Sequence, residues 1–171
     1  GAAVEGEISG SVARLSAGLC PVVIDVRRRQ RDGREAVSKL ASLDTLIGLH
    51  HPPISSGIRW MDENPASEWM LRLKTAIEGH EQVRAITSGH LHRSFSRLFG
   101  KTMVVVSPAT SIQLTLNVSE IDTRVPDGRE ILREEPPGFM LHMFDDGEIT
   151  AHTCLGGAWP SAVQYTHPFA R

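Results

Sequence analysis

The chain has little cysteine, few aromatic residues and almost no net charge, and each shortage excludes a class of protein. Cys20 and Cys154 are too few and too far apart for a disulfide framework, and neither belongs to a CxxC motif. We therefore expect two reduced thiols in a cytoplasmic protein. The chain has 18 Lys and Arg against 20 Asp and Glu, a formal charge of −2. This balance argues against a binder of nucleic-acid polymers or of anionic membranes.

Long apolar runs are also missing. Runs such as 103–106 are far too short to span a bilayer, and the first residues do not resemble a signal peptide. The sequence opens without methionine, which is compatible with a piece of a longer chain. A length of 171 residues predicts one domain, and 40% hydrophobic against 22% charged residues excludes wholesale disorder.

Local patterns predict a strand, a helix and a second strand in the middle of the chain. Residues 45–49 form a short apolar run that is typical of a buried strand. Asn64 can cap a helix whose first position suits Pro65, and an apolar stripe continues this helix over 65–78. Residues 83–88 then predict another buried strand.

Histidines follow both predicted strands, in a chain with eight histidines and one tyrosine. His50 comes directly after the first strand, His90 follows the second, and His92 lies two residues further on. The strand–helix–strand pattern predicts a parallel pair whose carboxyl ends share one edge, where open α/β sheets bind ligands. Because histidine is the commonest metal ligand, this convergence predicts a metal site. On spacing alone, unrelated surface or capping histidines are the stronger interpretation.

The second half of the chain is predicted to hold more strands than helices. Residues 119–137 form a charged excursion that contains proline, and Asp145-Asp146-Gly147 is a hairpin turn signal. Near the N-terminus, residues 21–26 favour a strand, and the basic run 27–34 is either a solvated loop or a phosphate-binding patch. Further strands are expected at 94–99, 102–107, 112–117, 139–144 and 148–155. Together these elements predict a mixed α/β (α+β) fold.

Two motifs resemble those of the calcineurin-like metallophosphoesterases. They are His50-His51-Pro52-Pro53 and, later in the chain, Ser88-Gly89-His90-Leu91-His92. The sequence looks most like the branch of class III cyclic-nucleotide phosphodiesterases and glycerophosphodiesterases, because further stretches follow at matching distances. These stretches are 57–62, 108–113, 135–139 and 141–142. The likeness covers roughly residues 45–157.

The resemblance implies a metal site. Members of this family have a β-sandwich flanked by helices, and this chain would hold its C-terminal portion with a terminal β-hairpin. Two divalent metal ions (Mn, Fe, Zn or Co) would bind there, one at His50 and His90 and the other at His92. His51 would line the substrate pocket. The implied activity is hydrolysis of a cyclic nucleotide or another small phosphodiester, in which the two cations polarise the phosphoryl group and hold a hydroxide.

Other features limit what this resemblance implies. Trp60 and Asp62, in the loop after the first motif, either line the substrate pocket or pack the loop. The family's upstream ligand motifs, Asp-x-His and Gly-Asn-His-Asp, do not occur in this sequence, and no catalytic residue is assigned. The alternative is a non-catalytic scaffold or binding module with the same fold.

The missing motifs lead us to expect an incomplete fragment of such an enzyme. Residues 1–44 match the family poorly, as a truncation or a frameshift would explain, and 45–157 would be the C-terminal part of the metallophosphoesterase domain. Residues 158–171 would be a tail. Exposed edges and apolar faces would favour a homo-oligomer.

Overall fold

The computed structural model describes residues 20–23, 37–38, 40 and 42–160. A five-stranded sheet has the order β1-β2-β3-β5-β4. Four strands are parallel, and β4 is an antiparallel edge strand beside β5. Their bounds are β1 (Cys20–Val23), β2 (Thr45–Leu49), β3 (Val83–Ser88), β4 (Phe95–Phe99) and β5 (Thr102–Val106).

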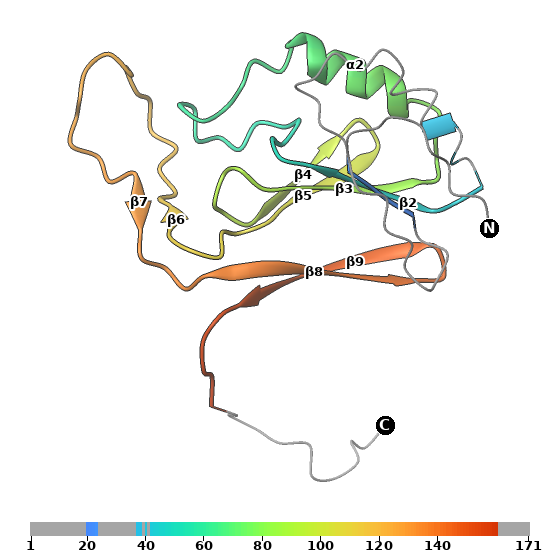
Figure 1. The fold of residues 1–171 in the computed structure, drawn as a ribbon. Coiled ribbons are helices and arrows are strands. Elements are labelled where there is room, and N and C mark those ends of the chain that lie inside the picture. Colours follow the sequence, from blue (N-terminus) through green and yellow to red (C-terminus); the bar gives the residue numbers. More distant parts are fainter. Residues whose placement is uncertain (1–19, 24–36, 39, 41, 161–171) are drawn as a thin grey trace, which may run out of the picture.

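Helix α2 (Glu68–Ile77) connects β2 to β3 and covers one face of the sheet (Figure 1). The two strands are parallel, which confirms the predicted strand–helix–strand unit. The helix buries Met70, Leu73, Ala76 and Ile77, which are spaced to lie on one side of a helix. Residues on this side of the sheet form the main core. Its members are Val37, Ile47, Leu49, Ile54, Leu73, Ile77, Val83, Ile86, Leu91, Val104 and Val106.

The helix begins three residues later than the predicted start at Pro65. Asn64 was expected to cap the helix, but its side-chain oxygen accepts a hydrogen bond from the Ala66 amide at 2.9 Å. The Ser67 amide donates to the Asn64 carbonyl at 2.9 Å, which closes a turn ahead of the helix. The prediction was wrong here because a local side-chain turn competes with helix formation at asparagine.

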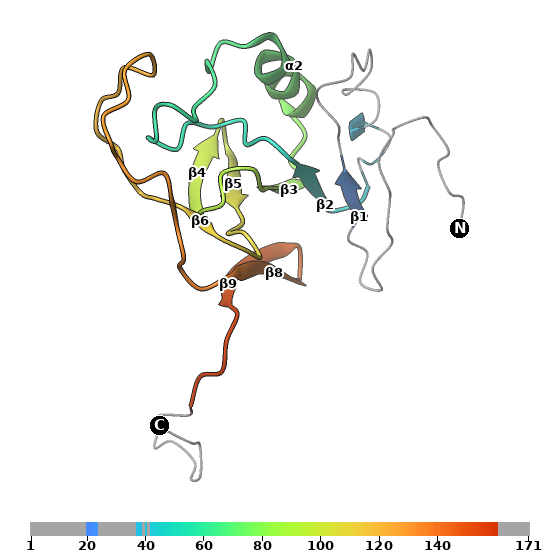
Figure 2. The same ribbon diagram turned by 60° about the vertical axis from the view of Figure 1, so that its left-hand side comes forward.

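A hairpin covers the opposite face of the sheet. It consists of β8 (Gly138–Asp145) and β9 (Glu148–Leu155), and both views place it on the side away from α2 (Figures 1 and 2). Asp146 and Gly147 have φ of 45° and 78°, and two positive φ angles are what a two-residue type I′ turn requires. The predicted hairpin and its turn are therefore confirmed.

The region between the sheet and the hairpin differs from prediction. Only β6 (Gln113–Leu114) forms within the expected strand 112–117, and it pairs with β7 (Leu132–Arg133), which was not predicted. The Arg129 side chain, paired with Asp127, donates to the carbonyls of Ser119 and Glu120. Side-chain contacts of this kind satisfy backbone groups in place of a longer ladder.

Several sequence features lie at the margins of this description. The basic run 27–34 and part of the expected strand 21–26 are outside the described residues. Within the described part of the chain, no helix has the length and apolar character needed to cross a membrane.

Candidate metal centre

Three imidazoles gather where β2 and β3 end. His50 and His51 follow β2, and His90 follows β3 after Gly89. The Gly89 amide donates to the His50 carbonyl at 3.2 Å, so the two segments are joined directly beyond the strands. One ligand nitrogen from each ring lies within 4.8 Å of those of the other two. We call His50, His51 and His90 the histidine cluster.

The rings of the cluster are in mutual contact. The centroid of His50 lies 5.0 Å from that of His51 and 5.1 Å from that of His90, both in edge-on geometry. His51 and His90 are closer, at 3.9 Å, with their planes tilted by 35°. His50 is exposed, His90 is half-buried, and His51 is buried with 8% of its surface exposed. The cluster therefore reaches from solvent into the edge of the core.

The turn that carries His90 and His92 has an unusual backbone. Their φ angles are 67° and 48°, in the left-handed region that residues with a side chain seldom adopt. Leu91 between them is almost fully buried, so packing holds the turn in place. Non-glycine residues in this region persist where the surroundings determine them, and they concentrate at functional sites.

His92 lies outside the histidine cluster but has a defined partner. Its Nδ1 is 3.1 Å from the Ile112 carbonyl oxygen. Because a carbonyl oxygen can only accept, Nδ1 carries the proton in this hydrogen bond. In the neutral ring, Nε2 then holds the lone pair that a metal ion needs.

The donor set of the cluster fits one divalent cation. Neutral imidazole suits Zn, Fe, Co and related metals, and catalytic zinc sites commonly use three protein ligands with one open position. Among the described residues, the cluster includes no carboxylate that could bridge two ions. The three imidazoles therefore suit a single ion better than a complete two-metal site.

Asp62 and Trp60 lie in the loop that follows the first histidine pair. The Asp62 carboxylate accepts hydrogen bonds from the Ser56 amide at 2.6 Å, the Ser56 hydroxyl at 2.7 Å and the Gly57 amide at 3.0 Å. These bonds close the loop, as the loop-packing interpretation expected. Trp60 is partly exposed. A pocket role for either residue stays a prediction.

The sequence prediction and the geometry select overlapping sets of histidines. His50, His90 and His92 were the expected ligands, and the structure brings His50 and His90 together. It adds His51, which was expected to line the pocket, and holds His92 on a separate backbone partner. The sequence analysis named the pair His50-His51 but not the gathering of the His51 ring with His50 and His90, and the pocket role of His51 stays a prediction.

Known proteins that resemble this chain are phosphodiesterases. A probable glycerophosphodiester phosphodiesterase of Arcobacter nitrofigilis is 30% identical over 71% of this chain and 42% of its own length. A probable cyclic nucleotide phosphodiesterase of Synechococcus is 35% identical, over 63% of this chain and 41% of its own. The 3′,5′-cyclic adenosine monophosphate phosphodiesterase of Pseudomonas aeruginosa is 27% identical, over 68% and 39%.

Two further comparisons add little to these. No protein-family model matches the chain. A candidate 5′-nucleotidase structure from Staphylococcus aureus aligns with 91% of this chain and 31% of its own at 11% identity, and its TM-score of 0.40 carries no argument.

The chain is a distant homologue of the class III cyclic-nucleotide phosphodiesterases and glycerophosphodiester phosphodiesterases, within the calcineurin-like metallophosphoesterases. It spans about four tenths of the length of these curated relatives. The elements that the structure describes are a mixed sheet, helix α2 and a terminal hairpin.

Proposed function

We propose that the histidine cluster binds a divalent metal ion as part of the metal centre of a phosphodiester hydrolase. The observation that carries this proposal is the gathering of three imidazole ligand atoms within 4.8 Å. They lie beyond the carboxyl ends of neighbouring parallel strands, the usual place for a ligand in an open α/β sheet. The substrate class would be a cyclic nucleotide or another small phosphodiester, as the names of the relatives suggest.

Each histidine has a role in this proposal. His50 and His90 would hold one ion, and His92 would offer Nε2 to a second. His51 has two possible roles, as a third ligand of the first ion or as a wall of the substrate pocket. Its burial against His90 supports either role, because both need a fixed ring. When bound, such ions would polarise a phosphoryl group and activate water.

The surroundings of the cluster suit this role. His50 is exposed and therefore accessible to a small anion, whereas His51 and Leu91 are buried. The Asp62 carboxylate is already occupied by three donors within its own loop. We also propose the finer architecture implied by the family, in which the sheet and hairpin belong to a β-sandwich in a cytoplasmic protein.

A non-catalytic scaffold is the second candidate function. The observation that favours it is the lack of any Asp or Glu within the cluster among the described residues. A scaffold requires no metal, so its histidines would serve packing alone. Metal binding therefore separates the two candidates.

The test is calorimetric titration of the purified chain with Zn²⁺ and Mn²⁺. Weak binding is expected, and His50→Ala and His90→Ala should abolish it. The matched control is His152→Ala, because His152 is an exposed histidine on the hairpin and its loss should leave binding unchanged. No binding by the unaltered chain, or equal binding by all the variants, would contradict the metal site and favour the scaffold.

A second measurement separates the roles of His51. If His51→Ala loses metal affinity as completely as His50→Ala does, His51 is a ligand. Retained affinity would make it a pocket residue. Hydrolysis of a chromogenic phosphodiester with added Mn²⁺ should be little or none for this chain, because three imidazoles offer no bridging carboxylate. Robust turnover that vanishes in His90→Ala would show that these residues suffice for catalysis.

A further inference from the structure

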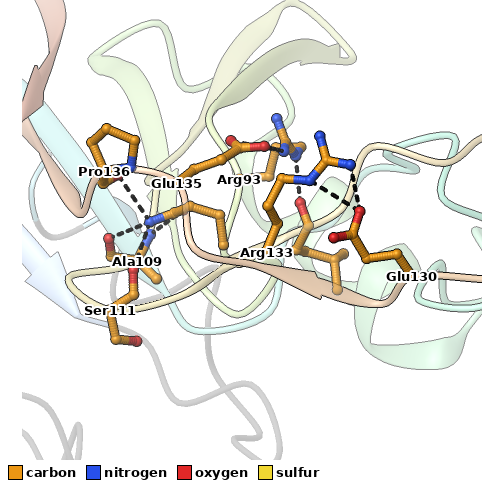
Figure 3. A network of polar contacts seen from close by, with 9 residues as sticks. Arg93, Ala109, Ser111, Glu130, Arg133, Glu135 and Pro136 are labelled. Carbon is orange, nitrogen blue, oxygen red and sulfur yellow. Dashed lines mark hydrogen bonds and ion pairs between the residues drawn. The ribbon is translucent and has the colours of Figure 1, made fainter.

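A buried glutamine organises the backbone against which His92 lies. Gln113 is 4% exposed, and its amide nitrogen donates to the carbonyls of Ala109 at 2.8 Å and Ser111 at 3.0 Å. Its amide oxygen accepts from the Ala109 backbone at 3.0 Å, and the Pro136 carbonyl lies 3.4 Å from the amide nitrogen. Figure 3 shows how Ala109, Ser111 and Pro136 converge on this point. One side chain thus ties the loop before β6 to the segment before β8.

An ion pair fixes the other side of the same segment. The Arg93 guanidinium donates from Nη2 to both oxygens of Glu135, at 2.8 and 3.0 Å (Figure 3), and from Nε to the Leu114 carbonyl at 2.6 Å. The Leu114 amide donates to the His92 carbonyl at 3.0 Å. Arg93 and Glu135 are largely shielded from water, with 20% and 35% of their side chains exposed. An ion pair that is partly shielded from water is screened less than an exposed one and holds its segment more firmly.

These contacts leave Ile112 held on both sides. Ile112 lies between Ser111, whose carbonyl is bonded to Gln113, and Gln113 itself, whose side chain is anchored in the core. Its side chain is exposed and contributes little packing of its own. The direction of its carbonyl therefore depends on the hydrogen bonds of Gln113. That carbonyl is the acceptor for His92 Nδ1.

We propose that Gln113 is a positioning residue for His92, because it fixes the Ile112 carbonyl that holds the ring as the Nδ1–H tautomer. Nε2 is then left unprotonated and fixed in direction. Only the use of Nε2 by a metal ion depends on the proposed function, since the tautomer is a property of the metal-free chain. Partners of this kind orient ligating histidines and commonly alter metal affinity 10–100-fold.

The test is the tautomer of His92, read from the ¹⁵N shifts of its ring in the labelled, metal-free chain. The unaltered chain should show Nδ1–H. Gln113→Leu, which removes every side-chain hydrogen bond, should give a mixture of tautomers. The matched control is Gln82→Leu, because Gln82 bonds to the Val37 carbonyl and lies away from His92. That control should leave the His92 signals unchanged.

A merely structural role for Gln113 would give a different result. In that case the Gln113→Leu variant would have a lower thermal stability than the unaltered chain but the same His92 tautomer. This result would overturn the proposal. If Gln113→Leu does not fold, Gln113→Glu keeps the acceptor for the Ala109 amide but loses the donor to the Ala109 and Ser111 carbonyls, and the Nδ1–H population should fall by a smaller amount. An unchanged tautomer in that variant, or Nε2–H in the unaltered chain, would also overturn it.

Metal titration of the same samples separates this inference from the proposed function. A tautomer that depends on Gln113, in a chain that binds no Zn²⁺, supports the positioning role and contradicts the metal centre. If the chain binds Zn²⁺ but the His92 tautomer is unchanged in Gln113→Leu, the metal centre is supported and the positioning role is overturned. If both hold, Gln113→Leu should weaken binding at the His92 position about 10-fold or more.

Discussion

The two faces of the sheet are packed to very different depths. The face under α2 buries a continuous cluster that includes Ile47, Ile86 and Val104, none of which is exposed at all. On the hairpin face, the buried cluster is Leu46 and Ala85, with half-buried Phe144 and Ile149 against them. The comparison indicates that burial on the helix face stabilises β2 and β3, the strands that precede His50 and His90, more than burial on the hairpin face does.

Polar contacts make up part of the hairpin interface. His142 Nε2 lies 3.1 Å from the Thr87 hydroxyl, and the Ser94 hydroxyl lies 2.9 Å from that of Thr153. His142 Nδ1 is buried and has no hydrogen-bond partner among the described residues. An unsatisfied polar atom reduces the benefit of burial. The hairpin should therefore detach more readily than the helix.

The largest expected effect comes from the helix face. Ile86→Ala should lower the free energy of unfolding by about 2–5 kcal/mol, because it leaves a cavity in the middle of the sheet. Urea unfolding followed by circular dichroism measures this loss. Thr75→Ala, on the exposed side of α2, is the control and should change stability little. A loss below about 1 kcal/mol for Ile86→Ala would contradict the assignment of the core.

A smaller effect is expected on the hairpin face. Phe144→Ala should cost about 1–2 kcal/mol, since the ring is only partly buried against Leu46 and Ala85. Hydrogen exchange should accelerate in β8 and β9 while β3 stays protected. Equal acceleration in β3 would show that the hairpin and the sheet unfold as one unit.

A pH dependence of the free energy of unfolding is expected from His142, on the hairpin face. Burial lowers the pKa of His142 from its ordinary value of 6.5, since the charged form is poorly solvated there. Neutral His142 makes its full contribution to the free energy of unfolding above pH 6.5. That contribution is lost as the pH falls through the lowered pKa of His142 in the folded chain. Thermal unfolding between pH 8 and pH 5 should therefore show a slope that His142→Gln reduces. The exposed His152→Gln control should keep that slope.

The smallest effect is expected at the surface of the helix. Glu68 and Arg72 form an exposed ion pair one turn apart. Glu68→Gln should lower stability by at most about 0.5 kcal/mol, and added salt should remove the difference. A loss comparable to that of Phe144→Ala would mean that the exposed surface contributes as much as the hairpin face.

The fold was predictable where short-range signals decide it. The strand patterns at 45–49 and 83–88 correctly predicted β2 and β3. Asp145-Asp146-Gly147 permits the positive φ angles that the hairpin turn needs. The start of α2 was misplaced because Asn64 had two local options, a cap and a turn, and took the turn. Strand β7 was missed because its two exposed residues have no periodic pattern to detect.

The candidate site was predictable only in part. The topology was enough to bring His50 and His90 together, since parallel strands end at one edge. The position of His51 depends on how the chain bends after β2, and no spacing rule describes that bend. The partner of His92 is a backbone carbonyl 20 residues away in the sequence, which only tertiary structure reveals.

X-ray absorption on the Zn²⁺-loaded chain tests the central claim most directly, because it counts the ligands of the bound ion. The histidine cluster predicts a shell of imidazole nitrogens at about 2.0–2.1 Å, the same shell in His152→Ala, and no such shell in His90→Ala, which should not retain the ion. A shell made of oxygen ligands alone, or the same imidazole count in His90→Ala, would contradict the assignment of the cluster as a metal centre.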